Sequence, residues 1–201
     1  MWMICGQQFF RAAGYIFYAS WFPTFLKQTR GVTTAQSGLL TSLPLLAVVA
    51  GSAAGGWIID WVYRRTGSRR LSRQGIAVPS MLLCAALIGL AYFAENATAA
   101  VVLITAGTFC SAFGGPCGYA ITIDKGGPYV STIFSLMNMV GNVGAAVCPV
   151  VVERFVHVAG SWDATLFLFA GIYLGAAVCW ALLDPEGTII PARSAAEREA
   201  K

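Results

Sequence analysis

Charged side chains are scarce in this sequence. Asp, Glu, Lys and Arg make up only 11% of its 201 residues, whereas hydrophobic residues make up 57%. This composition is hard to reconcile with a soluble domain of the same size, which needs a larger polar fraction. We therefore predict that the solvent for most of the chain is lipid.

The sequence also lacks the motifs of common enzymes and metal sites. It has a single histidine, His157, and no HExxH, GxSxG or Walker-type phosphate loop. Its six cysteines all lie in apolar runs without a C-x-x-C pair, so we interpret them as small apolar side chains. We predict no catalytic residue, no cofactor and no metal site, and therefore no enzyme.

Six apolar stretches are long enough to cross about 30 Å of hydrocarbon as helices. Helices are favoured over strands, because an open sheet would leave backbone groups unpaired in lipid. The connections are short, which predicts one all-α polytopic membrane bundle of six transmembrane helices. Their predicted bounds are Trp2 to Leu26, Ser37 to Ile59, Gly75 to Ala94, Ala99 to Ile123, Tyr129 to Val152 and Ala164 to Leu183.

Two regions follow from these spans. Residues 1–183 are predicted to form the six-helix bundle. Residues 184–201 are predicted to be a disordered cytoplasmic tail, because this segment is polar and rich in alanine and has too little apolar content to form a core.

Basic residues are unevenly distributed along the chain. Five arginines lie between Trp61 and Gln74, whereas the apolar runs on either side carry no Lys or Arg. If the first span runs outward, the predicted inner segments carry nine Lys and Arg residues and the outer segments three. Because basic residues resist translocation, this predicts a multi-pass protein of the cell (inner) membrane with both termini cytoplasmic. The net charge of +4 then reflects topology and contact with anionic headgroups, not nucleic-acid binding.

Three stretches resemble a known family. The pattern GxxxDxxxRR at residues 56–65 resembles the loop signature of the major facilitator superfamily, in the copy that joins the eighth and ninth helices. Residues 15–26 are similar to the seventh helix of its anion:cation symporter branch, which includes hexuronate, glucarate and galactonate carriers, sialin and vesicular glutamate transporters. Residues 123–127, followed by 132–142, are similar to the tenth-to-eleventh helix join of that branch.

The resemblance implies that the six spans correspond to helices seven to twelve of a twelve-helix carrier, with the amino-terminal half missing. The implied function is the carboxy-terminal half of a secondary active transporter for small organic anions, above all sugar acids such as hexuronate or glucarate. It would work by alternating access with a coupling cation, H⁺ or Na⁺. Such a half would need the missing half or another copy of itself. The alternative is a truncated, non-transporting membrane protein or assembly partner.

Arg11 is the one strongly ionised residue that the predicted spans place deep in the membrane, and an intramembrane charge is costly. A guanidinium there can hold a substrate carboxylate by paired hydrogen bonds, with Tyr15 and Tyr18 contacting sugar hydroxyls. The alternative is that Arg11 snorkels toward the cytoplasm and that the aromatic residues pack against other helices. The sequence leaves both open. At helical spacing one face carries Gln7, Arg11, Gly14, Tyr15, Tyr18 and Trp21.

A second polar stripe lies on the fifth predicted span, where the spacing places Ser131, Ser135, Asn138 and Asn142 on one face. In the resembled family this helix borders the central cavity. This implies that Asn138 and Asn142 bind the substrate, whereas we interpret the serines as interhelical hydrogen-bonding groups.

The resemblance also implies a cytoplasmic gate at residues 56–65, formed by Gly56, Asp60, Arg64 and Arg65. An anion is favoured at a helix amino terminus, and exposed arginine pairs are released at small cost, so such a latch can open and close. The alternative is that these are ordinary basic residues on the cytoplasmic side of the membrane, without a role in gating. This is our interpretation for Arg69, Arg70 and Arg73.

Overall fold

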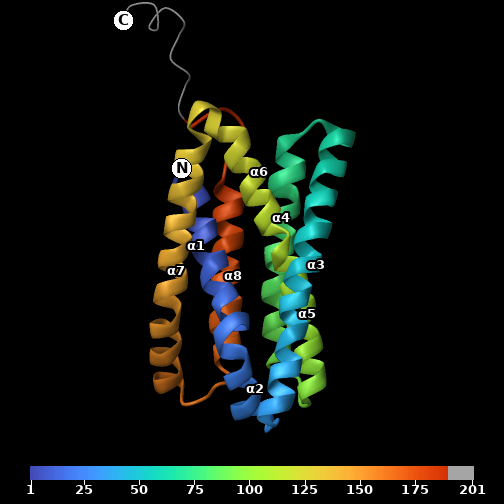
Figure 1. Ribbon diagram of the computed structural model, residues 1–201, viewed down its shortest axis with the longest axis vertical. Coiled ribbons are helices and arrows are strands. Elements are labelled where there is room, and N and C mark those ends of the chain that lie inside the picture. Colours follow the sequence, from blue (N-terminus) through green and yellow to red (C-terminus); the bar gives the residue numbers. More distant parts are fainter. Residues whose placement is uncertain (190–201) are drawn as a thin grey trace, which may run out of the picture.

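Helices make up almost all of residues 1–189, the part of the chain that the computed structural model describes (Figure 1). No strand occurs in these residues, so the all-α class predicted from the sequence is confirmed. The elements are α1 (Trp2–Ile16), the π-helical turn η1 (Phe17–Trp21), α2 (Phe22–Arg30), α3 (Thr34–Thr66), α4 (Arg69–Ala91), α5 (Ala97–Ala112), α6 (Gly114–Gly126), the 3₁₀ turn η2 (Gly127–Tyr129), α7 (Val130–Ala159) and α8 (Thr165–Leu182).

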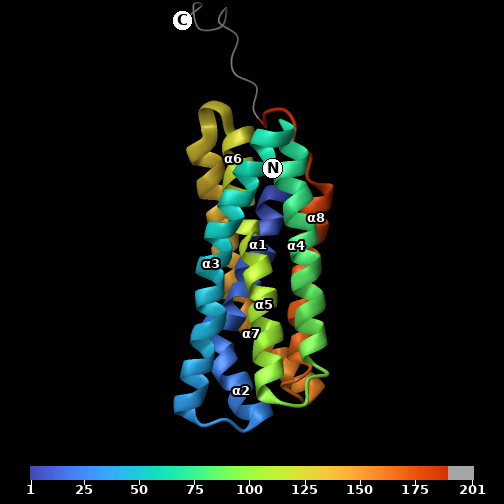
Figure 2. The same ribbon diagram turned by 90° about the vertical axis from the view of Figure 1, so that its right-hand side faces the viewer.

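The chain runs alternately up and down the long axis of the molecule, in α3, α4, α7 and α8 and in two continuous rods, α1 to α2 (the first rod) and α5 to α6 (the second rod) (Figures 1 and 2). α1, η1 and α2 follow one another without a break, and only Phe113 separates α5 from α6. The amino terminus, the turn between α3 and α4, the reversal between α6 and α7, and the end of α8 lie at one end of the bundle (Figure 1). The turns after α2, α4 and α7 lie at the other end.

Within residues 1–189, four helices are long and apolar enough to cross a membrane: α3, α4, α8 and the run Ala97–Ala159, which contains α5 to α7. The protein is therefore a multi-pass membrane protein. The predicted first span, Trp2 to Leu26, is not one of the four, because α1 ends at Ile16 where the π-helical turn begins. The six spans predicted from the sequence are therefore not confirmed by length and apolar composition alone, which take α5 to α7 as one run.

Small residues let the helices approach closely. α1 packs along α7 and α8, α4 packs along α5 and α8, and α3 packs along α5. A Cβ atom on Gly51 of α3 would overlap the carbonyl oxygen of Phe109 on α5, and one on Gly144 of α7 would overlap that of Phe9 on α1. Lipid supplies no hydrophobic force between helices, so this close backbone packing is a main source of their association.

Aromatic side chains fill the core where the first rod meets α8. Phe17, Phe22, Phe25 and Phe169 are fully buried, and the ring centroids of Phe17 and Phe169 lie 4.4 Å apart. Aromatic pairs at such distances add to the stabilisation from burial alone. This cluster anchors η1 and α2 to α8 and so fixes the position of the first rod in the bundle.

The predicted cytoplasmic loop, Trp61 to Gln74, is almost entirely helical. α3 and α4 leave only Gly67 and Ser68 between them. Gly67 has a φ of 64°, a left-handed conformation that favours glycine and ends α3. The Ser68 hydroxyl accepts a hydrogen bond from the backbone N–H of Leu71 at 3.2 Å and so caps α4. The basic cluster therefore lies on two helix ends and not on a loop.

Replacing Gly51 with alanine tests the close packing of α3 on α5. The new methyl group would meet a backbone oxygen that cannot move aside, so we expect the free energy of unfolding in detergent to fall by about 1–3 kcal/mol. Gly89→Ala is the matched control, because a Cβ at Gly89 has no neighbour within 4 Å. Equal stability of the two variants would contradict the packing described for α3 and α5.

Candidate functional site

Arg11 lies on α1, about 14 Å from the start of the helix at 1.5 Å per residue. Its Nε and Nη2 atoms both donate to Oε1 of Gln8, at 3.1 and 2.9 Å. The side chain is half-buried, and no carboxylate of residues 1–189 forms an ion pair with it. A neutral amide therefore orients the charge without neutralising it. Gln8 was not predicted from the sequence, although its spacing of three residues before Arg11 on a helix could have indicated the contact.

The far side of Arg11 faces the junction between α5 and α6. Its Cδ atom lies 3.5 Å from the position that a Cβ on Gly114 would take, and its Nη1 atom lies 3.6 Å from the corresponding position on Gly115. Both glycines lie near the middle of the rod that α5 and α6 form. The guanidinium therefore ends against another helix at mid-depth, whereas snorkelling would place it at a helix end.

The two tyrosines predicted to lie beside Arg11 differ in exposure. Tyr15 is 42% exposed, whereas Tyr18 is 1% exposed and its hydroxyl lies 4.0 Å from Sγ of Cys84 in the core. A π-helical turn begins at Phe17, where the period of 3.6 residues changes. Among the described residues Tyr18 is therefore a core residue beside this turn, whereas Tyr15 remains exposed.

Gln7 points into the bundle. Its side chain is fully buried, and its Nε2 atom donates to the carbonyl oxygen of Ile4 at 2.9 Å. Its Oε1 atom is buried without a hydrogen-bond partner among the described residues. The Nε2 atom lies 3.3 Å from the position of a Cβ on Gly118 of α6, so Gln7 brings a second polar group to the contact between α1 and α6.

The asparagines of α7 lie on the turn that faces Gln8. A Cβ on Gly141 would lie 2.8 Å from Cγ of Gln8, which places the segment from Asn138 to Asn142 next to the turn of α1 that carries Arg11. Asn138 is half-buried and donates to the carbonyl oxygen of Phe134 at 3.0 Å, whereas Asn142 is exposed. The structure thus brings Arg11, Asn138 and Asn142 to neighbouring turns, and no hydrogen bond joins Arg11 to either asparagine.

Ser131 and Ser135 lie on the exposed side of α7. The buried side of this helix consists of small and apolar residues, including Ile133, Met137 and Gly141. Neither serine makes an interhelical hydrogen bond within residues 1–189, so the interhelical role predicted for them is not observed there.

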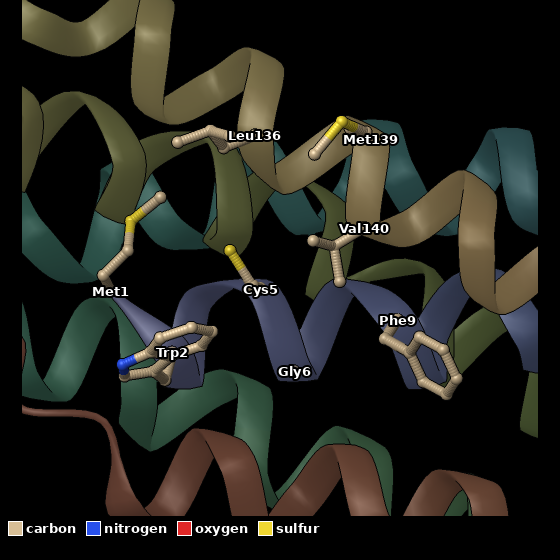
Figure 3. A pocket seen from close by; sticks show the side chains of 8 residues that line it. All are labelled: Met1, Trp2, Cys5, Gly6, Phe9, Leu136, Met139 and Val140. Atoms are coloured by element: carbon tan, nitrogen blue, oxygen red, sulfur yellow. The ribbon is translucent and has the colours of Figure 1, made fainter.

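A groove of about 420 Å³ lies between the first turns of α1 and residues 136–140 of α7, and its lining is almost wholly apolar (Figure 3). None of the predicted substrate-binding residues lines it. The groove is suited to apolar groups, and the polar residues around Arg11 lie elsewhere. Its lining consists of Met1, Trp2, Cys5, Gly6, Phe9, Leu136, Met139 and Val140.

The four predicted gating residues all lie on the last turns of α3. Asp60, Arg64 and Arg65 are exposed, and a Cβ on Gly56 has no neighbour within 4 Å. Arg64 donates from Nε to the carbonyl oxygen of Asp60 at 3.3 Å. The Asp60 carboxylate forms no ion pair with the described residues. The motif is therefore an outward-facing helical stripe without a partner in this part of the chain.

Arg73 forms a buried ion pair that the sequence analysis missed. Its Nε atom lies 3.0 Å from Oδ2 of Asp124, its guanidinium lies 5.2 Å from the ring centroid of Tyr63, and its side chain is 9% exposed. Arg69 approaches the same carboxylate at 3.9 Å. Arg73 is therefore not a free surface charge, because it ties α4 to the end of α6. Its partner lies 51 residues away, so no local pattern could have indicated it.

Gln74 makes a further contact at this end of the bundle. Its Nε2 atom donates to the carbonyl oxygens of Trp180, Ala181 and Leu183 at 2.9, 2.7 and 3.1 Å. The last carbonyl groups of a helix lack partners within the helix, and a side-chain donor can satisfy them. Lys125 Nζ likewise donates to the carbonyl oxygen of Glu186, so the segment after α8 is held against α6. The tail predicted for 184–201 lies mostly in 190–201, outside the described residues.

Residues 1–189 contain no group of three or more His, Cys, Asp or Glu side chains that could hold a metal ion.

A family model described as Major Facilitator Superfamily matches residues 4–200. The chain is 31% identical over 175 residues to the probable sulfoacetate transporter SauU of Cupriavidus necator, which covers 87% of this chain and 40% of that protein.

Two further relatives are transporters by name. The chain is 31% identical over 169 residues to the probable galactarate/D-glucarate transporter GudP of Escherichia coli K12, covering 84% of this chain and 37% of that protein. It is 26% identical over 170 residues to the hexuronate transporter of Bacillus subtilis, covering 81% and 40%. The chain thus spans about two fifths of the length of these relatives. These matches point to a transporter rather than an enzyme.

Replacing Asp124 with asparagine tests the ion pair that joins α4 to α6. The change leaves the Arg73 guanidinium largely buried without its counter-charge, so we expect a loss of about 2 kcal/mol of stability in detergent, between the values for exposed and buried pairs. Asp184→Asn, at an exposed position, is the control. Addition of Arg73→Gln should recover part of the loss, and strictly additive losses would contradict a direct pair.

Proposed function

The chain belongs to the Major Facilitator Superfamily, and on this premise we propose that it forms one six-helix half of a secondary active transporter for small organic anions, sugar acids in particular. The observation that carries the proposal is the setting of Arg11. Its guanidinium lies at mid-depth, is held by the neutral amide of Gln8 and is free of any described carboxylate. Such a charge is costly in a membrane unless an anion uses it.

The chemistry around Arg11 suits an acidic sugar. A guanidinium binds a carboxylate through two parallel hydrogen bonds, which gives both affinity and orientation. Tyr15, Asn138 and Asn142 would contact hydroxyl groups, since they lie on or near the same turns and are exposed or half-buried. The named substrates of the relatives, which are sulfoacetate, galactarate or glucarate, and hexuronate, are all organic anions. Tyr18 is not among the proposed contacts, because it is buried in the core.

We assign six crossings to the bundle: the rod from α1 to α2, then α3, α4, the rod from α5 to α6, α7 and α8. The alternating direction of these rods supports the assignment, as does the reversal at η2, where Gly127 has a φ of 49° (Figure 1). The motif at residues 56–65 and the stretches at 15–26, 123–127 and 132–142 resemble the carboxy-terminal half of such carriers, so the six crossings would be helices seven to twelve.

Transport by alternating access would use a second six-helix unit that encloses the substrate together with Arg11. The carboxylates of residues 1–189 lie at or near helix ends, at Asp60, Glu95, Asp124, Glu153 and Asp163, with Asp184 and Glu186 just after α8. A proton-coupled cycle needs a titratable group near mid-membrane. If the coupling ion is H⁺, that carboxylate would therefore belong to the second unit.

The stripe on α3 would serve as the inner gate. Gly56 leaves room for a neighbouring helix, and the exposed Asp60 carboxylate can accept hydrogen bonds from the amino end of that helix. Arg64 and Arg65 are free to pair with carboxylates of the second unit and to release them at small cost, because exposed ion pairs contribute little net stability.

Uptake measurements test the proposed function. Cells that produce the full chain together with the amino-terminal half of the E. coli glucarate relative should take up labelled glucarate. Arg11→Ala should lower this uptake at least about tenfold, as expected when a charged hydrogen bond of ~1.5–3 kcal/mol is lost. Arg70→Ala, at an exposed position near the start of α4, is the control. Undiminished uptake by Arg11→Ala would contradict the site, and no uptake by any pairing would favour a non-transporting protein.

Labelling from outside the cell tests the proposed orientation, with both termini cytoplasmic. In a variant without native cysteines, a cysteine at Ser161, after α7, should react with a membrane-impermeant maleimide in intact cells. A cysteine at Ser68, between α3 and α4, should react only after the cells are broken. The reverse pattern would show that the bundle is inserted the other way.

A further inference from the structure

We propose that Gln8 is a positioning residue that holds the Arg11 guanidinium in the orientation that binds the anion. This inference rests on the proposed role of Arg11. The contact between the two side chains uses both Nε and Nη2 of Arg11 and a single acceptor, Oε1 of Gln8. One edge of the planar guanidinium is thus occupied, and the Nη1 end remains free. The hydrogen bonds to Gln8 therefore determine which edge of the Arg11 guanidinium remains available to a ligand.

Gln8 can act in this way because it is itself fixed. Its side chain is 6% exposed and lies against α7, where a Cβ on Gly141 would come within 2.8 Å of Cγ and 3.1 Å of Nε2. α7 thus backs the amide from the side opposite to Arg11. A buried side chain that is packed on one side and hydrogen-bonded on the other has few alternative rotamers. The position of the Oε1 atom is accordingly set by the contact between α1 and α7.

The free end of Arg11 faces the glycines of α6. Nη1 lies 3.6 Å from where a Cβ on Gly115 would be, so the missing side chains at Gly114 and Gly115 leave the guanidinium its place beside the helix. Gln8 on one side and α6 on the other confine the guanidinium plane. An anion would bind through Nη1 and the remaining hydrogen of Nη2.

A neutral acceptor has a specific advantage at position 8. A carboxylate there would orient Arg11 equally well, but it would also neutralise the charge and compete with the substrate carboxylate. An apolar residue would leave the charge available but no longer oriented, and the flexible side chain could turn toward the nearer helix end. Only an uncharged acceptor both orients the guanidinium and keeps its charge for a ligand.

Two substitutions of similar length separate these effects. Gln8→Met removes the acceptor, and Gln8→Glu keeps an acceptor but adds a negative charge. Hydrogen exchange of the Arg11 Nε–H group, measured by NMR on the full chain with ¹⁵N-labelled arginine, reports the orientation. We expect exchange to become at least about tenfold faster in Gln8→Met and to stay slow in Gln8→Glu, because only the first variant loses the hydrogen bond.

Uptake kinetics of the chain assembled with a second six-helix unit report how each substitution changes the affinity for glucarate. Both variants should raise the KM for glucarate about tenfold or more while kcat changes less than KM, since a weakened charged hydrogen bond mainly lowers affinity. Slow exchange together with a raised KM in Gln8→Glu is a combination that a merely structural role would not produce. Gln28→Met and Gln28→Glu are matched controls, because Gln28 lies on the same rod, is exposed and makes no side-chain hydrogen bond within the described residues.

The outcomes distinguish this inference from the function on which it rests. If Arg11→Ala leaves uptake unchanged, the proposed site fails, and the role of Gln8 fails with it. If Arg11→Ala abolishes uptake while both Gln8 variants keep the KM of the parent chain, Gln8 is not a positioning residue and the proposed function stands. Fast exchange of the Arg11 Nε–H group in the parent chain would also overturn the inference. Should Gln8→Met fail to fold, the exchange in the parent chain and the KM of Gln8→Glu still decide it.

Discussion

The cost of placing a charge in hydrocarbon determines how this molecule is organised. Apart from Arg11, the charged residues of the described chain lie at or near helix ends, where water or an opposite charge is within reach. Arg30 pairs with Asp163 at 3.1 Å at one end of the bundle, and Arg73 pairs with Asp124 at 3.0 Å at the other. Arg11 has only the amide of Gln8, and this exception to the constraint is the basis for the anion site that we propose.

The contacts that hold the bundle together also build this site. α1 and α7 approach so closely that Phe9 and Gly144 touch through backbone, and one turn away the same interface fixes Gln8 against Gly141. On the other side, the interruption at Phe113 and the two glycines after it bring α6 beside Arg11. Helix packing and charge placement therefore depend on the same small residues, and a change in the angle between α1 and α7 would move the guanidinium.

Much of this arrangement could be predicted from the sequence, because the composition and the length of the apolar stretches indicate directly which segments lie in lipid. The all-helical class, the membrane location and the family all followed from such local patterns. The burial of Tyr18 and the π-helical turn beside it were not predicted, because such a turn has no signature in hydrophobicity. The pair of Arg73 with Asp124 and the capping of α8 by Gln74 were also missed, since each depends on residues brought together only by the fold.

A structure of the chain assembled with its second six-helix unit and a bound sugar acid is the sharpest test of the proposed anion site. We expect a substrate carboxylate within about 3 Å of the Nη1 end of Arg11, as in charge-assisted hydrogen bonds, with the Gln8 contact still in place. A substrate carboxylate bound elsewhere, with Arg11 turned toward the lipid headgroups, would contradict it.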